Sequence, residues 1–263
     1  MNEDNSEKIE QFAVINAGNT CYIDSLLMGM FFFQTSNDYL LRNDIKDGMS
    51  ILLQESIKNN FVECVRKYKT VTGDTVSAIR YFCHNLGWKK ENPEELLEQQ
   101  DVMEFYEFLM RKFEGTFIKI QRETITEALR DSDDIGKERT IPYITLALPD
   151  DNIHKSVTIK KMLNDWMHHN IKDVERVVIT ENGTEKKNVK GLDIIHITNN
   201  PPIIGLGIHR FYNMKDSKGD TIIKRNNIDV IIQKKISPFY NKFGLNRSEW
   251  IFHSAICHPK LYR

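Results

Sequence analysis

An apolar run near the N-terminus follows a short polar segment. Residues 23–33 are mostly hydrophobic, whereas residues 18–20, Gly-Asn-Thr, are types that favour turns. Asp24 and Ser25 stand where a helix would begin, as cap or first-turn residues. The pattern predicts a loop followed by a buried helix, with Cys21 at or near the N-terminus of that helix.

Helical periodicity dominates the rest of the first half of the chain. Between residues 37 and 90, apolar positions recur at the spacing of several amphipathic helices. A further helix is predicted from about 94 to 113, because Val102, Phe105 and Leu109 fall on one face at i, i+3 and i+7.

The second half of the chain has strand-like patterns instead. Asn182-Gly183 between two alternating segments is typical of a hairpin turn, and Pro142 indicates a strand start or an edge strand. The predicted elements are a strand at 140–148, a short helix at 157–167, a hairpin over 175–198 and a strand pair at 222–224 and 230–233.

Composition excludes several classes of protein. The 263 residues are 40% hydrophobic, which is enough for a substantial core in one large domain or two small ones. The net charge is −1 with scattered basic residues, which argues against nucleic acid as a partner. No apolar run reaches the length of a membrane span, and residues 1–11 are polar and acidic, so we expect a flexible tail and no signal peptide or membrane association.

The four cysteines, Cys21, Cys64, Cys83 and Cys257, are far apart and form no Cys-x-x-Cys pair. A disulfide framework would be denser, and a zinc site needs closer pairs. We therefore expect reduced thiols in a cytoplasmic or nuclear protein, with no metal and no cofactor. Abundant Asn, Lys and Ile are also consistent with an AT-rich genome, including those of some viruses.

Cys21 is the strongest candidate for chemistry. A helix N-terminus favours a thiolate, which attacks carbonyl carbon atoms, although a lone cysteine beside an apolar helix is more often a small buried hydrophobe. Residues 16–27, Asn-x-Gly-Asn-Thr-Cys-Tyr-x-x-Ser-Leu-Leu, resemble the cysteine box of the ubiquitin-specific proteases, papain-like cysteine deubiquitinases. The resemblance implies that Cys21 is the nucleophile and that Asn16 donates to the oxyanion. Asp24 stands where that family usually has Asn.

A second motif of the same family occurs in the predicted helix at 94–113. Residues 99–105, Gln-Gln-Asp-Val-Met-Glu-Phe, resemble its glutamine box. The resemblance implies that Gln99, Gln100 and Asp101 lie along the groove for the ubiquitin tail, with Asp101 meeting an arginine near the end of that tail. Without the resemblance, these residues would be interpreted as a solvated helix face.

A third motif, residues 201–211, resembles the family's palm strand, with His209 where Lys is usual; we expect His209 to be a half-exposed strand residue. The resemblance implies a papain-like α+β fold in a single domain over 12–263. It would have a helical thumb at about 12–115 and, at about 116–263, an antiparallel palm and reduced, zinc-free fingers, with Cys21 at the cleft between thumb and palm.

The general base is the uncertain part of the pattern. Residues 250–258 resemble the strand before the family's histidine box, which makes His258 the histidine that ends this strand and places the Gly-His-Tyr segment beyond Arg263. In a different alignment His258 is itself the base, and His253 is a weaker candidate. No orienting carboxylate follows in either case. The chain would then be incomplete at its C-terminus, an inactive ubiquitin-binding member, or active with a substitute histidine.

The expected function is thiol-dependent cleavage of ubiquitin, or a ubiquitin-like modifier, from protein conjugates at the modifier C-terminus. The alternative is a catalytically inactive ubiquitin-binding pseudoenzyme or scaffold. A more remote alternative is an adaptor unrelated to ubiquitin. The sequence leaves modifier, chain linkage, target proteins and oligomeric state open.

Overall fold

The computed structural model describes residues 13–126, 135–180, 183–215, 218–236 and 250–256. They divide into two compact units. The first contains residues 13–116 together with 253–256, and the second contains residues 117–252. No helix in the described ranges is long and apolar enough to cross a membrane.

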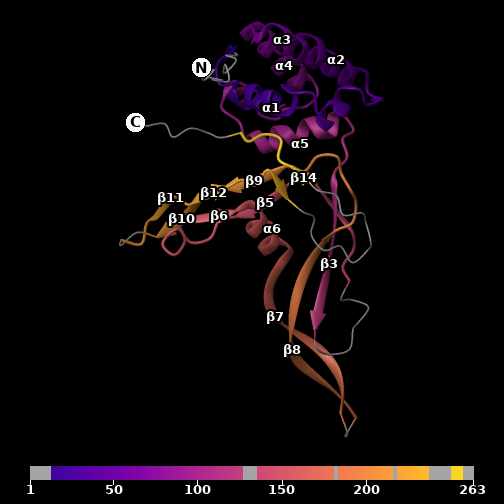
Figure 1. The fold of residues 1–263 in the computed structure, drawn as a ribbon, viewed down its shortest axis with the longest axis vertical. Coiled ribbons are helices and arrows are strands. Elements are labelled where there is room, and N and C mark those ends of the chain that lie inside the picture. The colour runs from indigo at the N-terminus through magenta and orange to yellow at the C-terminus, as the bar shows by residue number, and fades with distance from the viewer. Residues whose placement is uncertain (1–12, 127–134, 181–182, 216–217, 237–249, 257–263) are drawn as a thin grey trace, which may run out of the picture. The chain divides into compact units, whose positions relative to one another are not determined.

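The first unit is mainly helical (Figure 1). Its core is formed by large apolar side chains that recur at helical spacing, and Phe31, Phe61, Phe105 and Phe113 are all fully buried. Its elements are β1 (Ala13–Val14), α1 (Cys21–Phe31), η1 (Ser36–Leu41), α2 (Gly48–Ser56), η2 (Ile57–Val62), α3 (Glu63–Tyr68), β2 (Thr70–Val71), α4 (Gly73–Asn85), η3 (Pro93–Leu97) and α5 (Val102–Lys112).

Helix α1 is the central element of this unit. It packs against α4 and α5, and Ile23, Leu27 and Phe31 on it are fully buried. Residues 48–68 form a nearly continuous helical segment in which η2 is a π-helical turn. The sequence predicted several amphipathic helices between residues 37 and 90 but not the π turn, which depends on local packing.

The second unit is built mainly from strands. A four-stranded antiparallel sheet has the order β4-β3-β8-β7, and α6 packs against β5 and contributes Met162 and Leu163 to an apolar core with Ile120 and Ile195. The elements are β3 (Ile118–Thr126), β4 (Arg139–Ile141), β5 (Ile144–Ala147), β6 (Ser156–Thr158), α6 (Ile159–Met167), β7 (His168–Thr180), β8 (Gly183–Ile197), β9 (Leu206–His209), β10 (Phe211–Lys215), β11 (Thr221–Arg225), β12 (Asp229–Ile231), β13 (Lys235–Ile236) and β14 (Trp250–Ile251).

The predicted hairpin is confirmed, although its strands are longer than expected. Strands β7 and β8 contain 13 and 15 residues, and β3 pairs only with the part of β8 from Gly191 onward. The outer part of the hairpin is therefore a two-stranded ribbon, visible as a long arm in Figure 1. The reduced, zinc-free fingers that the resemblance implied for this half of the chain stay a prediction.

Three other predictions for this unit are wrong. The strand at 140–148 is two strands, because Pro142 lacks a backbone N–H and interrupts the pairing. The expected strand pair does not form: β11 pairs with β10, whereas β12 pairs in parallel with β6. Between β11 and β12, buried Asn226 donates to the Pro149 carbonyl (2.8 Å) and accepts from the Ile228 amide (3.0 Å). Strands β5 and β9 are also parallel, so the sheets are not uniformly antiparallel.

Candidate active site

The segment before α1 is a tight loop attached to a short parallel strand pair. Strand β1 pairs with β2, and the amide of Ile15 continues the ladder by donating to the Val71 carbonyl (3.0 Å). Gly18 and Asn19 then have φ angles of +79° and +54°, the left-handed region that glycine and asparagine tolerate best. We call residues 16–20 the cysteine loop.

Cys21 is the first residue of α1, which confirms its predicted position at a helix N-terminus. Its free thiol is half-buried. The first amides of a helix lack partners within the helix, and the positive end of the helix dipole lies there. The role of Cys21 as a nucleophile stays a prediction.

Asn16 lies at the start of the cysteine loop, five residues before Cys21. Its side chain is exposed and makes no hydrogen bond to any residue that the structure describes. The amide is therefore available to a ligand, which is what the oxyanion role requires.

Thr20 connects the loop to the helix. Its hydroxyl oxygen accepts from the Ala17 amide and donates to Oδ2 of Asp24, both at 3.0 Å. Asp24 is buried, and that burial raises its pKa to about 6, although the Thr20 hydrogen bond and the Arg80 charge act in the opposite direction.

The sequence analysis did not identify Arg80, whose side chain binds two carbonyls of the cysteine loop. It lies on α4, is only 4% exposed, and donates through Nη1 to the Gly18 carbonyl (2.7 Å) and through Nη2 to the Ala17 carbonyl (3.4 Å). The signal was present in the sequence, because Arg80 lies on the same helical face as Val76, Ile79 and Cys83, all of which are fully buried.

Only residues 102–105 of the glutamine motif lie in a helix, so the prediction of one continuous helix from 94 to 113 that carries the whole motif is wrong. The helical turn η3 ends at Leu97, and α5 begins only at Val102. Asp101 is the N-cap of α5, and its carboxylate accepts from the amides of Met103 (2.6 Å) and Glu104 (3.2 Å). Such a cap satisfies amides that have no helical partner, and this local preference outweighs the continuous apolar periodicity.

The fold nevertheless brings the two motifs together. Nδ2 of Asn19 donates to the carbonyl of Leu97 at 3.1 Å, across 78 positions of sequence. Gln100 donates to the Glu95 carbonyl, which ties the segment back onto η3, while Gln99 and Asp101 are exposed. The cysteine loop therefore lies directly beside the residues that precede α5.

An aromatic cluster supports this junction. Tyr22, the residue after Cys21, contacts Phe105 of α5 edge-on with ring centroids 5.2 Å apart, and its hydroxyl accepts from Nε1 of Trp88 at 3.2 Å. Tyr22, Trp88 and Phe105 are buried. The N-terminus of α1 is thus held rigidly against α5.

Of the two histidines considered as the general base, only His253 lies among the described residues. Nε2 of His253 lies 3.4 Å from the Met30 carbonyl, near the C-terminal end of α1. Met30 is nine residues beyond Cys21, about 14 Å along a helix axis, so His253 is out of hydrogen-bonding reach of the Cys21 sulfur. His258 lies outside the described residues.

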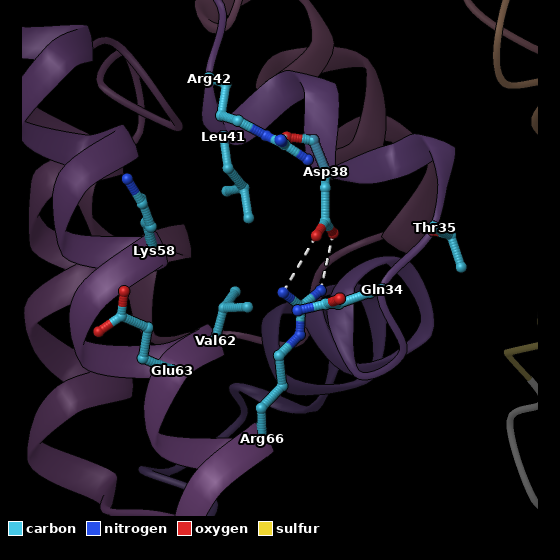
Figure 2. A pocket seen from close by; sticks show the side chains of 9 residues that line it. All are labelled: Gln34, Thr35, Asp38, Leu41, Arg42, Lys58, Val62, Glu63 and Arg66. Atoms are coloured by element: carbon cyan, nitrogen blue, oxygen red, sulfur yellow. Dashed lines mark hydrogen bonds and ion pairs between the residues drawn. The ribbon is translucent and has the colours of Figure 1, made fainter.

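A pocket occurs at the opposite end of α1 (Figure 2). It has a volume of about 460 Å³, and inside it Arg66 forms a two-pronged ion pair with Asp38 (2.7 and 3.1 Å). Its lining residues are Gln34, Thr35, Asp38, Leu41, Arg42, Lys58, Val62, Glu63 and Arg66. None of them belongs to the cysteine loop or the glutamine motif, so this pocket is separate from the candidate active site.

The remaining expectations concern the third motif and metals. Within the third motif, residues 206–209 form β9 and Phe211 begins β10, and His209 is exposed rather than half-exposed.

Within the described ranges no group of three or more His, Cys, Asp or Glu side chains is arranged to hold a metal ion. The absence of zinc stays a prediction.

Comparison with known proteins agrees with the sequence motifs. The family model described as ubiquitin carboxyl-terminal hydrolase matches residues 12–258. No match was found among curated proteins.

Proposed function

The chain belongs to the ubiquitin carboxyl-terminal hydrolase family, whose members are cysteine deubiquitinases that act on ubiquitin and its conjugates, and from this premise we propose that it is an active thiol-dependent deubiquitinase. Cys21 is the nucleophile in this proposal. The observation that carries it is the position of Cys21 at the N-terminus of α1, directly after a loop whose Asn16 side chain is exposed and makes no hydrogen bond to a described residue.

The chemistry proceeds in two steps. The Cys21 sulfur forms a bond to the carbonyl carbon of the modifier's terminal glycine, the bond from that carbon to the lysine nitrogen of the conjugate breaks, and the departing amine takes a proton. Water then hydrolyses the thioester, which releases a carboxylate and restores the thiol. Asn16 and nearby backbone amides donate to the oxyanion that forms in both steps.

Gln99 and Asp101 are the proposed contacts for the modifier tail. Both are exposed, and the bond from Asn19 to Leu97 places their segment beside the cysteine loop. The cap role of Asp101 leaves it able to accept a further bond, because a carboxylate has about four lone-pair sites. Gln100 has a supporting role, because its amide already donates to the Glu95 carbonyl.

Family membership implies a papain-like fold, and we assign its parts as follows. The helical first unit is the thumb, and the sheets of the second unit form the palm. The β7–β8 hairpin corresponds to the fingers. The two units together form one catalytic domain.

A second candidate, a ubiquitin-binding pseudoenzyme, is favoured by one observation. Among the described residues no histidine forms a hydrogen bond with Cys21, and His253 is directed to Met30 instead. In the active-enzyme proposal His258 is the candidate base.

The test is hydrolysis of a fluorogenic ubiquitin C-terminal amide, with Cys21→Ala as the control. We expect turnover that falls at least about 10³-fold in the control, because the covalent route is lost. His258→Ala, compared with His253→Ala, then identifies the base: only the former should abolish turnover. Absence of turnover together with measurable binding of intact ubiquitin would support the pseudoenzyme instead.

A further inference from the structure

Arg80 is a buried cation on α4. It is 4% exposed, and its neighbours on the same face of α4 are Val76, Ile79 and Cys83. Burying a guanidinium group is costly unless its donors are satisfied. Within the described part of the chain Arg80 has no ion-pair partner; its hydrogen bonds go to the carbonyls of Ala17 and Gly18.

These two carbonyls lie in the middle of the cysteine loop. Asn16 comes directly before Ala17, and Cys21 follows Gly18 by three residues. Gly18 and Asn19 have positive φ angles, which glycine and asparagine tolerate best. The hydrogen bonds from Arg80 on α4 then attach the loop to another element in this conformation.

A second buried charge holds the loop from the side of α1. Asp24 accepts from the Thr20 hydroxyl group, whose oxygen in turn accepts from the Ala17 amide. Oδ1 of Asp24 and Nε of Arg80 are both buried and have no hydrogen-bond partner among the described residues. Two incompletely satisfied charged groups are thus placed against one loop, an arrangement that costs stability.

We propose that Arg80 is a positioning residue for the hydrolysis described above: by fixing the Ala17 and Gly18 carbonyls, it holds the Asn16 side chain and the Cys21 sulfur in their reactive arrangement. The proposal rests on the proposed function. Arg80 touches neither the substrate nor the reacting atoms and acts through the backbone of the cysteine loop.

The planar shape of the guanidinium group is essential to this role. Two nitrogens of one rigid fork reach two successive carbonyls, whereas a lysine ammonium group is a single centre on a flexible chain. Arg80→Lys therefore keeps the charge but loses the two-point attachment.

Arg66 provides a matched control. It also donates to carbonyls of consecutive residues, those of Phe31 (2.9 Å), Phe32 (3.3 Å) and Phe33 (3.1 Å), but at the opposite end of α1. Arg66→Lys therefore removes the same kind of contact from the same helix, away from the cysteine loop.

The experiment compares the full chain with Arg80→Lys and Arg66→Lys, using the fluorogenic ubiquitin amide and amide hydrogen exchange. For Arg80→Lys we expect kcat to fall about 10- to 100-fold with KM within about twofold, because misplaced reacting groups affect chemistry more than binding. Exchange of the amides of residues 17–21 should accelerate about tenfold or more. Arg66→Lys should change neither quantity.

A fall in kcat of the same size in both variants would overturn the proposal, since it would indicate general destabilisation. Unchanged kcat in Arg80→Lys would also overturn it.

If the wild-type chain does not hydrolyse the substrate, the proposed function fails and the loop measurements decide the role of Arg80. Iodoacetamide alkylation is then followed by peptide mapping at Cys21, with half-buried Cys64 as the internal reference. A changed alkylation rate at Cys21 alone, with faster loop exchange, supports Arg80 as the residue that fixes the loop. Unchanged exchange and alkylation in Arg80→Lys would refute it.

Discussion

The two ends of α1 are each held by an arginine, but the two arrangements differ. At the C-terminal end, Arg66 donates to three carbonyls and is neutralised by a two-pronged ion pair with Asp38 (Figure 2). At the N-terminal end, Arg80 donates to two carbonyls, and both it and Asp24 retain a buried polar atom without a hydrogen-bond partner among the described residues.

The two ends of α1 therefore differ in the role of their charged groups: one end contributes to stability, and the other positions the loop beside Cys21. Satisfied charges at the C-terminal end fix the helix at little cost. Incompletely satisfied charges at the N-terminal end lower stability but hold an unusual loop beside Cys21. Such local costs are concentrated at functional sites, and the predictions below test whether this applies here.

The largest expected effect is a loss of turnover when a residue beside the N-terminal end of α1 is replaced. Asn16→Ala should lower kcat about 10²- to 10³-fold with little change in KM, because an oxyanion donor acts mainly in the transition state. Steady-state hydrolysis of the ubiquitin amide measures both. Asn37→Ala is the control, since Asn37 is buried at the other end of α1 and donates to the Met30 carbonyl, so it should affect stability only. Equal losses of kcat and of ubiquitin affinity in Asn16→Ala would contradict the oxyanion role.

The second prediction concerns the two carboxylates. The Asp24 pKa is raised from 3.8 to about 6 by burial, so the folded state binds this proton more tightly than the unfolded state. The stability from this group is therefore present below pH 3.8 and is lost as the pH rises through 6. Asp24→Asn should increase the free energy of unfolding at pH 7 by roughly 2–3 kcal/mol, and by less at pH 4.5.

Urea unfolding of wild type and variant across pH 4.5–8 measures this difference. Asp38→Asn is the matched variant at the other end and should lower stability at pH 7, because Arg66 loses its ion-pair partner. A gain in Asp24→Asn that does not vary with pH, or a loss at pH 7, would refute the account of Asp24.

A smaller effect, on the free energy of unfolding, is expected when Arg66 alone is replaced. Arg66→Ala should lower the free energy of unfolding by about 2 kcal/mol, because Asp38 and the carbonyls that end α1 lose charged hydrogen bonds. The kcat for the ubiquitin amide should stay within about twofold of wild type, since this end of the helix takes no part in the chemistry. A loss of kcat as large as that of Arg80→Lys would remove the distinction between the two ends.

No effect is expected from chelation. Because the chain lacks Cys-x-x-Cys pairs, treatment with EDTA should leave both turnover and unfolding midpoint unchanged. Elemental analysis that finds one zinc per chain would contradict this.

Features decided by neighbouring residues could be predicted from the sequence. The turn-prone residues before Cys21 and the apolar run after it correctly predicted a helix that begins at the cysteine, and Asn182-Gly183 correctly predicted a hairpin. Such preferences act over a few residues, so they can be recognised without knowledge of the fold. The helix boundary at Asp101 was also local in origin, but the apolar periodicity concealed it.

Tertiary structure decided how these pieces form a site. The sequence does not indicate that Asn19 would bond to Leu97, 78 positions away, or that Arg80 would reach the carbonyls of Ala17 and Gly18. The parallel pairings of β5 with β9 and of β6 with β12 were equally hidden. Each depends on which distant surfaces are buried together, because contacts between remote segments form only when the whole core has been packed.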